Sequence, residues 1–177
     1  MSVRGVRHSK CDDRRSQVSF SWYRCKSWLE VTGAGRVVRE GQTNLGEAWL
    51  RGPVVLSWDD ARHGALDPKD GHNLVFHEFA HKLDMLDGAA DGTPPLTDQT
   101  QLRAWIQTMT REFLALRDDA ESGRRTVLDT YGATNPAEFF AVATECFFEK
   151  AQQLRRRHLP VYELLKDYYQ QDPAERR

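Results

Sequence analysis

The stretch HNLVFHEFAHKLDMLDG, from His72 to Gly88, constrains the fold more than any other part of the sequence. A helix over this stretch is apolar on nearly every side, and a helix of that kind is buried by neighbouring elements. Its apolar residues are Leu74, Val75, Phe76, Phe79, Ala80 and Leu83. The sequence therefore predicts a buried helix with Asp70 or Asn73 as its N-cap and Gly88 at its end.

Three polar side chains interrupt this apolar helix, namely His77, Glu78 and His81. Residues four apart lie on the same face of a helix, so the two imidazoles project toward one point, where each can reach a zinc ion at roughly 2.0–2.1 Å. Glu78 lies about 100° around the helix, beside the metal, where it can accept a proton from an activated water. Burying such groups without partners costs several kcal/mol. The pattern therefore predicts an HExxH zinc site.

A catalytic zinc site needs a third protein ligand and an open fourth position for water. The only later histidine is His158, in a basic stretch that we expect to be exposed. Better candidates are the carboxylates of a helix predicted to begin after Asn135, namely Glu138, Glu145 and Glu149. Glu138 and Glu145 lie seven apart on nearly the same face. Glu138 is at the helix start, where the dipole favours a carboxylate. Spacing leaves both glutamates open, and Glu138 can also do no more than complete the cap.

Two further residues are candidates for supporting roles at the site. Asp84 follows His81 by three positions and can hold an imidazole in one tautomer, although it can equally be a surface aspartate of the helix. Tyr131 lies seven residues before Glu138, and its phenol can donate a hydrogen bond to the oxyanion of a tetrahedral intermediate. The alternative for Tyr131 is an ordinary loop aromatic.

Short strands and turns are predicted before the central helix. Segments 36–39, 47–50 and 54–58 have strand character. Pro53 cannot donate a ladder hydrogen bond, so the last strand begins there or lies at a sheet edge. That strand can pair with an extended substrate or be an ordinary member of the sheet. The stretch 61–71, which contains glycine and proline, is predicted to be a loop.

The remainder of the chain has helical periodicity. Thr97 or Asp98 can cap the first of these later helices, and Asn135 and Pro136 fit the N-cap and first position of the next. The predicted segments are 98–120, 136–154 and 161–170. The expected fold class is α+β, with a small N-terminal β-sheet or hairpin followed by a mostly helical metal-binding half.

Composition narrows the classes of function. The 177 residues suit one domain, and a formal net charge of −1 gives no reason to expect nucleic acid as a partner. No apolar run has membrane-spanning length, so we expect no membrane association. Three cysteines form no even disulfide framework, and the N-terminus lacks the apolar centre of a secretory signal. The expected location is the cytoplasm.

Four segments closely resemble the Mlc titration factor A family, a group of bacterial zinc-dependent metallopeptidases. They are GEAWLRGPVVLSWDD, DGHNLVFHEFAHKLDMLDG, YGATNPAEFFAVATECFFE and YYQQDP. The likeness runs from about residue 31 to 173 and implies a zincin-like metallopeptidase domain over 31–173. Residues 1–30 differ from the family pattern, and we expect them to be a divergent, poorly ordered N-terminus, with a genuine start and an altered start as the alternatives.

The resemblance also implies roles for individual residues. It makes His77, His81 and Glu138 the zinc ligands, Glu78 the general base and Tyr131 a residue beside the site. It implies a peptide or protein substrate, aminopeptidase-like cleavage, and binding to a glucose-responsive transcriptional repressor. The alternative is a zinc-stabilised protein that sequesters such a repressor without significant catalysis. The residues favour an enzyme, because a purely structural zinc site is closed, rich in thiolates and has no base.

Overall fold

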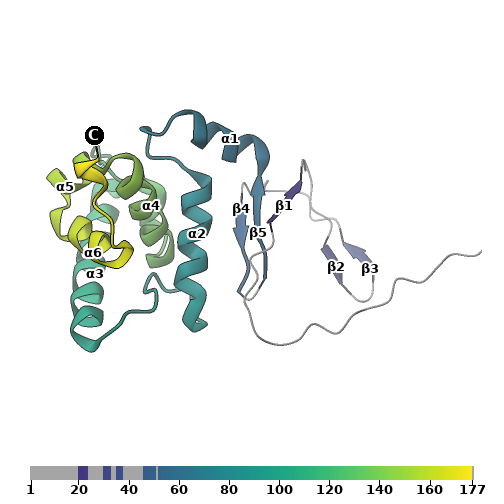
Figure 1. The fold of residues 1–177 in the computed structure, drawn as a ribbon, viewed down its shortest axis with the longest axis horizontal. Helices are drawn as coiled ribbons and strands as arrows, with labels where there is room; N and C mark the ends of the chain where they lie inside the picture. Colours follow the sequence, from purple (N-terminus) through teal and green to yellow (C-terminus); the bar gives the residue numbers. More distant parts are fainter. Residues whose placement is uncertain (1–19, 24–29, 33–34, 38–45, 51, 177) are drawn as a thin grey trace, which may run out of the picture.

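The computed structural model describes residues 20–23, 30–32, 35–37, 46–50 and 52–176. Within these ranges, short strands lie on one side of helix α2 and a cluster of helices lies on the other (Figure 1). This arrangement confirms the predicted α+β class. The expected N-terminal segment 1–30 lies outside the described residues except for 20–23 and 30.

The larger sheet has the strand order β1-β5-β4. Strand β5 (Val54–Ser57) is parallel to β1 (Phe20–Tyr23) and antiparallel to β4 (Gly46–Ala48), and it begins directly after Pro53 as predicted. Because β5 is paired on both sides, it is an ordinary sheet member, and the suggestion that it pairs with substrate is wrong. Strands β2 (Glu30–Thr32) and β3 (Gly35–Val37) form a separate antiparallel pair.

Helix α1 (Trp58–Leu66) corrects the prediction of a loop over 61–71. The Ser57 side chain caps this helix by accepting the backbone N–H of Asp60 at 3.4 Å. Asp59 and Asp60 add negative charge to its first turn, where the helix dipole favours it. Gly64 lies within this helix and Pro68 follows its end, so the prediction of a loop holds only for residues 67–71.

Helix α2 (Leu74–Asp84) is the helix predicted to carry the HExxH motif. Asn73 caps it, because its side chain accepts the backbone N–H groups of Val75 and Phe76. A 3₁₀ turn, η1 (Met85–Asp87), follows and ends at Gly88 in the left-handed conformation. One side of α2 packs against β4 and β5 and the other against α4, so the motif lies between the two halves of the fold (Figure 1).

The remaining helices form the cluster beyond α2. They are α3 (Gln99–Glu121), capped by Asp98, α4 (Pro136–Glu149), α5 (Ala151–Arg157) and α6 (Leu159–Tyr169). Short 3₁₀ segments η2 (Thr130–Ala133) and η3 (Pro173–Glu175) lie before α4 and after α6. The single helix predicted over 136–154 is divided at Lys150, whose backbone leaves the helical region.

Helix α4 forms the centre of the hydrophobic core. Its residues from Phe139 to Phe147 are buried, and they pack against α3 and α6 through aromatic side chains such as Trp105 and Tyr162. Interiors packed in this way hold their side chains in fixed positions. The glutamates of α4 therefore project from a rigid support. Among the described residues, no helix combines the length and apolar character needed to cross a membrane.

Candidate metal centre

Helices α2 and α4 bring three of the predicted ligand side chains together. Nε2 of His77 lies 3.0 Å from Oε2 of Glu138 and 3.2 Å from Nε2 of His81. The third edge of this triangle, from Nε2 of His81 to Oε2 of Glu138, is 3.3 Å. His77 and Glu138 are 61 residues apart in the sequence, so the fold and not local spacing creates the cluster.

The donor triangle has the dimensions that a tetrahedral zinc ion requires. Zn–N and Zn–O bonds of roughly 2.0–2.2 Å at tetrahedral angles place neighbouring donor atoms about 3.3–3.5 Å apart. The observed separations of 3.0 to 3.3 Å need only a small expansion to fit. Two imidazoles and one carboxylate are also the donor set of catalytic zinc sites that keep one position open. The residues therefore fit the metal that the sequence predicts.

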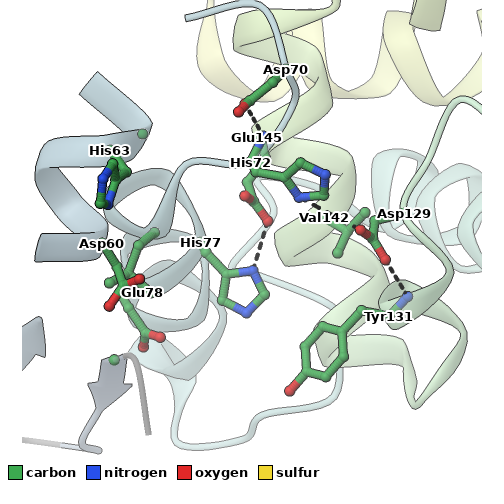
Figure 2. Close-up of a pocket in the computed structure, with 13 residues that line it drawn as sticks. Asp60, His63, Asp70, His72, His77, Glu78, Asp129, Tyr131, Val142 and Glu145 are labelled. Carbon is green, nitrogen blue, oxygen red and sulfur yellow. Dashed lines mark hydrogen bonds and ion pairs between the residues drawn. The ribbon is translucent and has the colours of Figure 1, made fainter. Parts of the chain in front are cut away.

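Glu145 lies on the opposite edge of the His77 ring from Glu138. Its Oε1 accepts a hydrogen bond from Nδ1 of His77 at 2.8 Å (Figure 2), and its Oε2 accepts the backbone N–H of Asn73 at 2.5 Å. A bond of this kind at Nδ1 directs the Nε2 lone pair toward the donor triangle. The two glutamates that spacing could not separate thus occupy different sides of one imidazole.

A second carboxylate of α4 anchors the start of α2. Glu149 accepts a hydrogen bond from the Asn73 side chain at 2.8 Å and from the backbone N–H of Gly71 at 3.1 Å. This role of Glu149 was not predicted from the sequence. The available signal was its position one turn after Glu145, because residues four apart share a helix face. Together the two glutamates fix the end of α2 from which His77 projects.

Glu138 has both of the functions that the sequence left open. Its backbone N–H donates to Oδ1 of Asn135 at 3.0 Å and completes the cap, while its side chain reaches the two histidines. Burial alone would raise the pKa of Glu138, but the hydrogen bonds with His77 and His81 lower it to about 2. For His77 burial lowers the pKa, yet its bonds to Glu138 and Glu145 raise it to about 10. In the metal-free protein these groups therefore form an ion pair.

Glu78 is buried beside the triangle, with only 5% of its surface exposed. Burial raises the pKa of its carboxyl group. The carboxylate lies directly against β4, because a Cβ atom added to Gly46 would be 2.5 Å from Oε1 of Glu78. Figure 2 shows Glu78 and Tyr131 on opposite sides of the His77 ring. The predicted base therefore stands beside the predicted ligands without being one of the three donors.

Tyr131 lies at the mouth of the site in η2. Its side chain is 55% exposed, and its ring centroid is 6.0 Å from that of His77. The backbone N–H of Tyr131 donates to Oδ1 of Asp129 at 2.7 Å, which fixes the 3₁₀ turn that carries the phenol. Burial raises the pKa of Tyr131, with a further contribution from Glu138 and Glu78, so its hydroxyl stays protonated and able to donate at neutral pH.

Asp84 is fully buried, with 0% of its surface exposed, so the alternative of a surface aspartate is wrong. Its Oδ2 accepts the backbone N–H of Gly92 at 2.9 Å. The described contact is thus to a backbone turn and not to an imidazole. Burial raises the pKa of Asp84, and the hydrogen bond from Gly92 opposes this effect. His158, the only histidine after His81, is not near the donor triangle and pairs with Glu112 at 2.9 Å.

A cavity of about 660 Å³ extends from the metal centre between α1, α2 and α4 (Figure 2). Leu74 and Val142 contribute apolar surface. The ionisable residues that line it are Asp60, His63, Asp70, His72, His77, Glu78, Asp129 and Glu145. Within the described part of the chain, no lysine or arginine lines this cavity. Its lining thus carries five carboxylates and three histidines.

The chain is similar to several known proteins. An uncharacterized protein of Synechocystis sp. is 45% identical over 141 residues, which are 78% of this chain and 51% of the relative. Proteins named Mlc titration factor A from Yersinia enterocolitica and Yersinia pestis are 36% and 35% identical over 84% and 85% of this chain. The chain covers 55% of each of these two relatives. It thus spans about half the length of the curated relatives it matches.

A family model matches residues 26–170, which include the HExxH motif and helix α4. The predicted resemblance to the Mlc titration factor A family is confirmed by the named relatives. This chain belongs to the family of glucose-regulated metallo-peptidases M90.

Proposed function

We propose that this chain is a zinc-dependent peptidase that hydrolyses peptide bonds with Glu78 as the general base. The observation that carries the proposal is the donor triangle of His77, His81 and Glu138 with a buried carboxylate at its side. Membership of a metallopeptidase family supports the same reaction class. Aminopeptidase-like cleavage, the cytoplasmic location and a catalytic domain over 31–173 belong to this proposal.

In the proposed site, His77, His81 and Glu138 hold zinc, and Glu145 keeps the His77 ring in the ligating tautomer. When bound, zinc lowers the pKa of a water to about 7 and polarises the scissile carbonyl group. The imidazoles must bind as neutral ligands, so the proton that His77 carries in the metal-free protein leaves when the site is loaded.

Glu78 accepts a proton from the water that attacks the scissile carbonyl carbon. It then delivers this proton to the nitrogen of the leaving amine, as the C–N bond breaks. Burial supports this role, because a raised carboxyl pKa brings the group closer to the operating pH of a general acid–base catalyst. The Tyr131 hydroxyl donates a hydrogen bond to the oxyanion that develops on the carbonyl oxygen.

Substrate enters along the cavity beside β4. Among the described strands β4 lies at an edge of its sheet, and Gly46 brings that edge against Glu78. An extended peptide that pairs with such an edge has its main chain fixed by hydrogen bonds. Its scissile bond then lies between Glu78 and Tyr131.

The variant Glu78→Gln tests the proposed base. We expect it to bind zinc stoichiometrically but to cleave a panel of short chromogenic peptides at least about 10³-fold more slowly. Glu163→Gln is the control, because it removes an exposed carboxylate of α6 that does not line the cavity. A chelator should abolish wild-type cleavage, and zinc should restore it. Normal cleavage by Glu78→Gln would refute the assignment.

A second candidate function is that of a binding protein for a transcriptional repressor. It is favoured by the name Mlc titration factor A, which the Yersinia relatives carry. Glu78→Gln separates the two functions, because it retains the surface and the metal site. Retained repressor binding by this variant, together with a wild type that cleaves no peptide of the panel, would favour the binding protein.

A further inference from the structure

We propose that Asp84, Gly92 and Trp105 form a network that holds the metal-binding parts of α2 and α4 at a fixed separation. In this network Asp84 is a positioning residue of the metal centre. The inference rests on the proposed function only in requiring that His77, His81 and Glu138 bind zinc.

The first observation concerns Asp84 itself. It is the last residue of α2, about one turn beyond His81, and it is fully buried. Its Oδ2 accepts the backbone N–H of Gly92, whereas its Oδ1 has no hydrogen-bond partner within the described residues. A buried carboxylate that is only partly paired destabilises a fold. Retaining it here points to a task that an apolar residue cannot perform.

The second observation concerns the turn that Asp84 holds. Gly92 has a φ of +80°, and a Cβ atom at this position would lie 2.3 Å from the carbonyl oxygen of Pro136. Only glycine therefore allows the turn to touch the first residue of α4. Glu138 follows Pro136 by two positions. The turn thus connects the end of α2 to the part of α4 that carries the carboxylate of the donor triangle.

The third observation concerns Trp105, which binds the same turn from helix α3. The indole Nε1–H of Trp105, in α3, donates to the carbonyl oxygen of Gly92 at 2.9 Å. Trp105 is buried and packs edge to face against Phe140 of α4, with ring centroids 5.5 Å apart. The backbone of Gly92 therefore has both its N–H and its C=O bound to buried side chains, and the turn cannot shift without breaking one of these bonds.

These contacts matter because a metal site tolerates little displacement. Metal–ligand distances must agree with their ideal values within about 0.2 Å. The side chains of a binding site must be held within about 0.5 Å of their productive positions. His81 and Glu138 approach to 3.3 Å although they belong to different helices. Glu145 and Glu149 fix the beginning of α2 against α4. The Asp84–Gly92–Trp105 network fixes the end of α2 against α4.

The test measures the zinc dissociation constant by competition with a chromogenic chelator. For Asp84→Ala we expect the constant to rise about 10–100-fold. Asp87→Ala is the matched control, because Asp87 lies between Asp84 and Gly92 in the sequence and accepts the N–H of Ala89 at 3.0 Å but is exposed. The control should stay within about twofold of the wild type. Asp84→Asn should lie between the two, since its amide oxygen can still accept the Gly92 N–H.

The variant Trp105→Phe gives an independent measurement, because it removes the indole donor and keeps an aromatic ring. We expect its zinc dissociation constant to rise in the same direction as that of Asp84→Ala, by a smaller factor. If Asp84→Ala does not fold, Trp105→Phe decides, and an unchanged constant overturns the proposal. A lower unfolding temperature of zinc-free Asp84→Ala with unchanged zinc affinity would show a merely structural role and also overturns it. A wild type that binds no zinc would contradict both this inference and the proposed function.

Discussion

At the scale of single residues, the position of Glu78 depends on the absence of a side chain at Gly46. The nearest atoms to an added Cβ are Oε1, Cδ and Cγ of Glu78, at 2.5 to 2.7 Å. These atoms belong to the end of a flexible side chain, so an added methyl group would displace the carboxylate without disrupting the backbone. The geometry of the base and the stability of the fold can therefore be separated at this position.

We predict that Gly46→Ala lowers kcat by about 10–100-fold, because a displacement of about 1 Å is enough to misalign a catalytic group. Zinc content and unfolding temperature should change little. The measurements are steady-state kinetics, metal analysis and thermal unfolding, with Ala48→Ser in the same strand as the control. Unchanged kcat in Gly46→Ala would show that Glu78 does not need the space that glycine provides.

The ionisation of His77 predicts how pH acts on the metal-free protein. Burial lowers the His77 pKa, but the bonds to Glu138 and Glu145 raise it from 6.5 to about 10. A raised pKa means that this contribution to the free energy of unfolding is complete below pH 6.5 and is lost as pH rises toward 10. Glu138, whose pKa is lowered from 4.5 to about 2, contributes fully above pH 4.5 and loses its contribution as pH falls toward 2.

We therefore predict that chelator-treated protein loses stability between pH 6.5 and 10, as measured by urea unfolding at several pH values. Zinc-loaded protein should lose less over this range, because the metal binds the neutral imidazole. The variant His77→Ala should remove the dependence in the metal-free state. A metal-free wild type of constant stability over this range would contradict the ion pair.

At the scale of elements, the sequence predicted α2, α3 and the start of α4 because their caps are local signals. Asn73, Asp98 and Asn135 each precede a run of helical periodicity, and each accepts a backbone N–H of its helix. Helix α1 was not predicted, because the glycine and proline of 61–71 indicate a loop, whereas Ser57 and the acidic first turn indicate a helix start. The division at Lys150 follows from packing of α5 and α6, which no local pattern encodes.

The cap residues of α2 and α3 differ in the further hydrogen bonds that their side chains make, and this difference can be tested. We predict that Asn73→Ala lowers the free energy of unfolding by more than Asp98→Ala, although each removes a cap worth about 0.5–2 kcal/mol. The reason is that the Asn73 side chain also donates to Glu149 at 2.8 Å, whereas the Asp98 cap is exposed. Urea unfolding of both variants in zinc-free buffer measures the difference. Equal losses would mean that the bond to Glu149 contributes no stability.

At the scale of the whole molecule, some residues of the site can be predicted from the sequence and others cannot. The HExxH residues could be found by spacing alone, because all three lie within two turns of α2. The third donor could not, since Glu138 and Glu145 share a face of α4 and only the packing of α4 on α2 decides which meets Nε2 of His77. The cavity walls could not be predicted either, because α1 was not recognised as a helix.

These walls determine the electrostatic character of the cleft. Asp60, Asp70 and Asp129 line the cavity together with Glu78, and no lysine or arginine of the described residues balances them there. In a concave site an excess of carboxylates raises the local concentration of positively charged ligands. We predict that peptides with lysine or arginine near the scissile bond have a higher kcat/KM than matched peptides with aspartate or glutamate.

The expected ratio of kcat/KM for cationic and acidic peptides is at least about tenfold at low ionic strength, which corresponds to about 1.4 kcal/mol. It should decrease as salt rises from 10 mM to 0.5 M, because exposed charges are screened over about 10 Å at 0.1 M and over shorter distances at higher salt. Asp60→Asn should lower the ratio, and Asp87→Asn, which changes an exposed carboxylate outside the cavity, should not. A ratio near one that is insensitive to salt would show that the acidic walls do not contact the substrate.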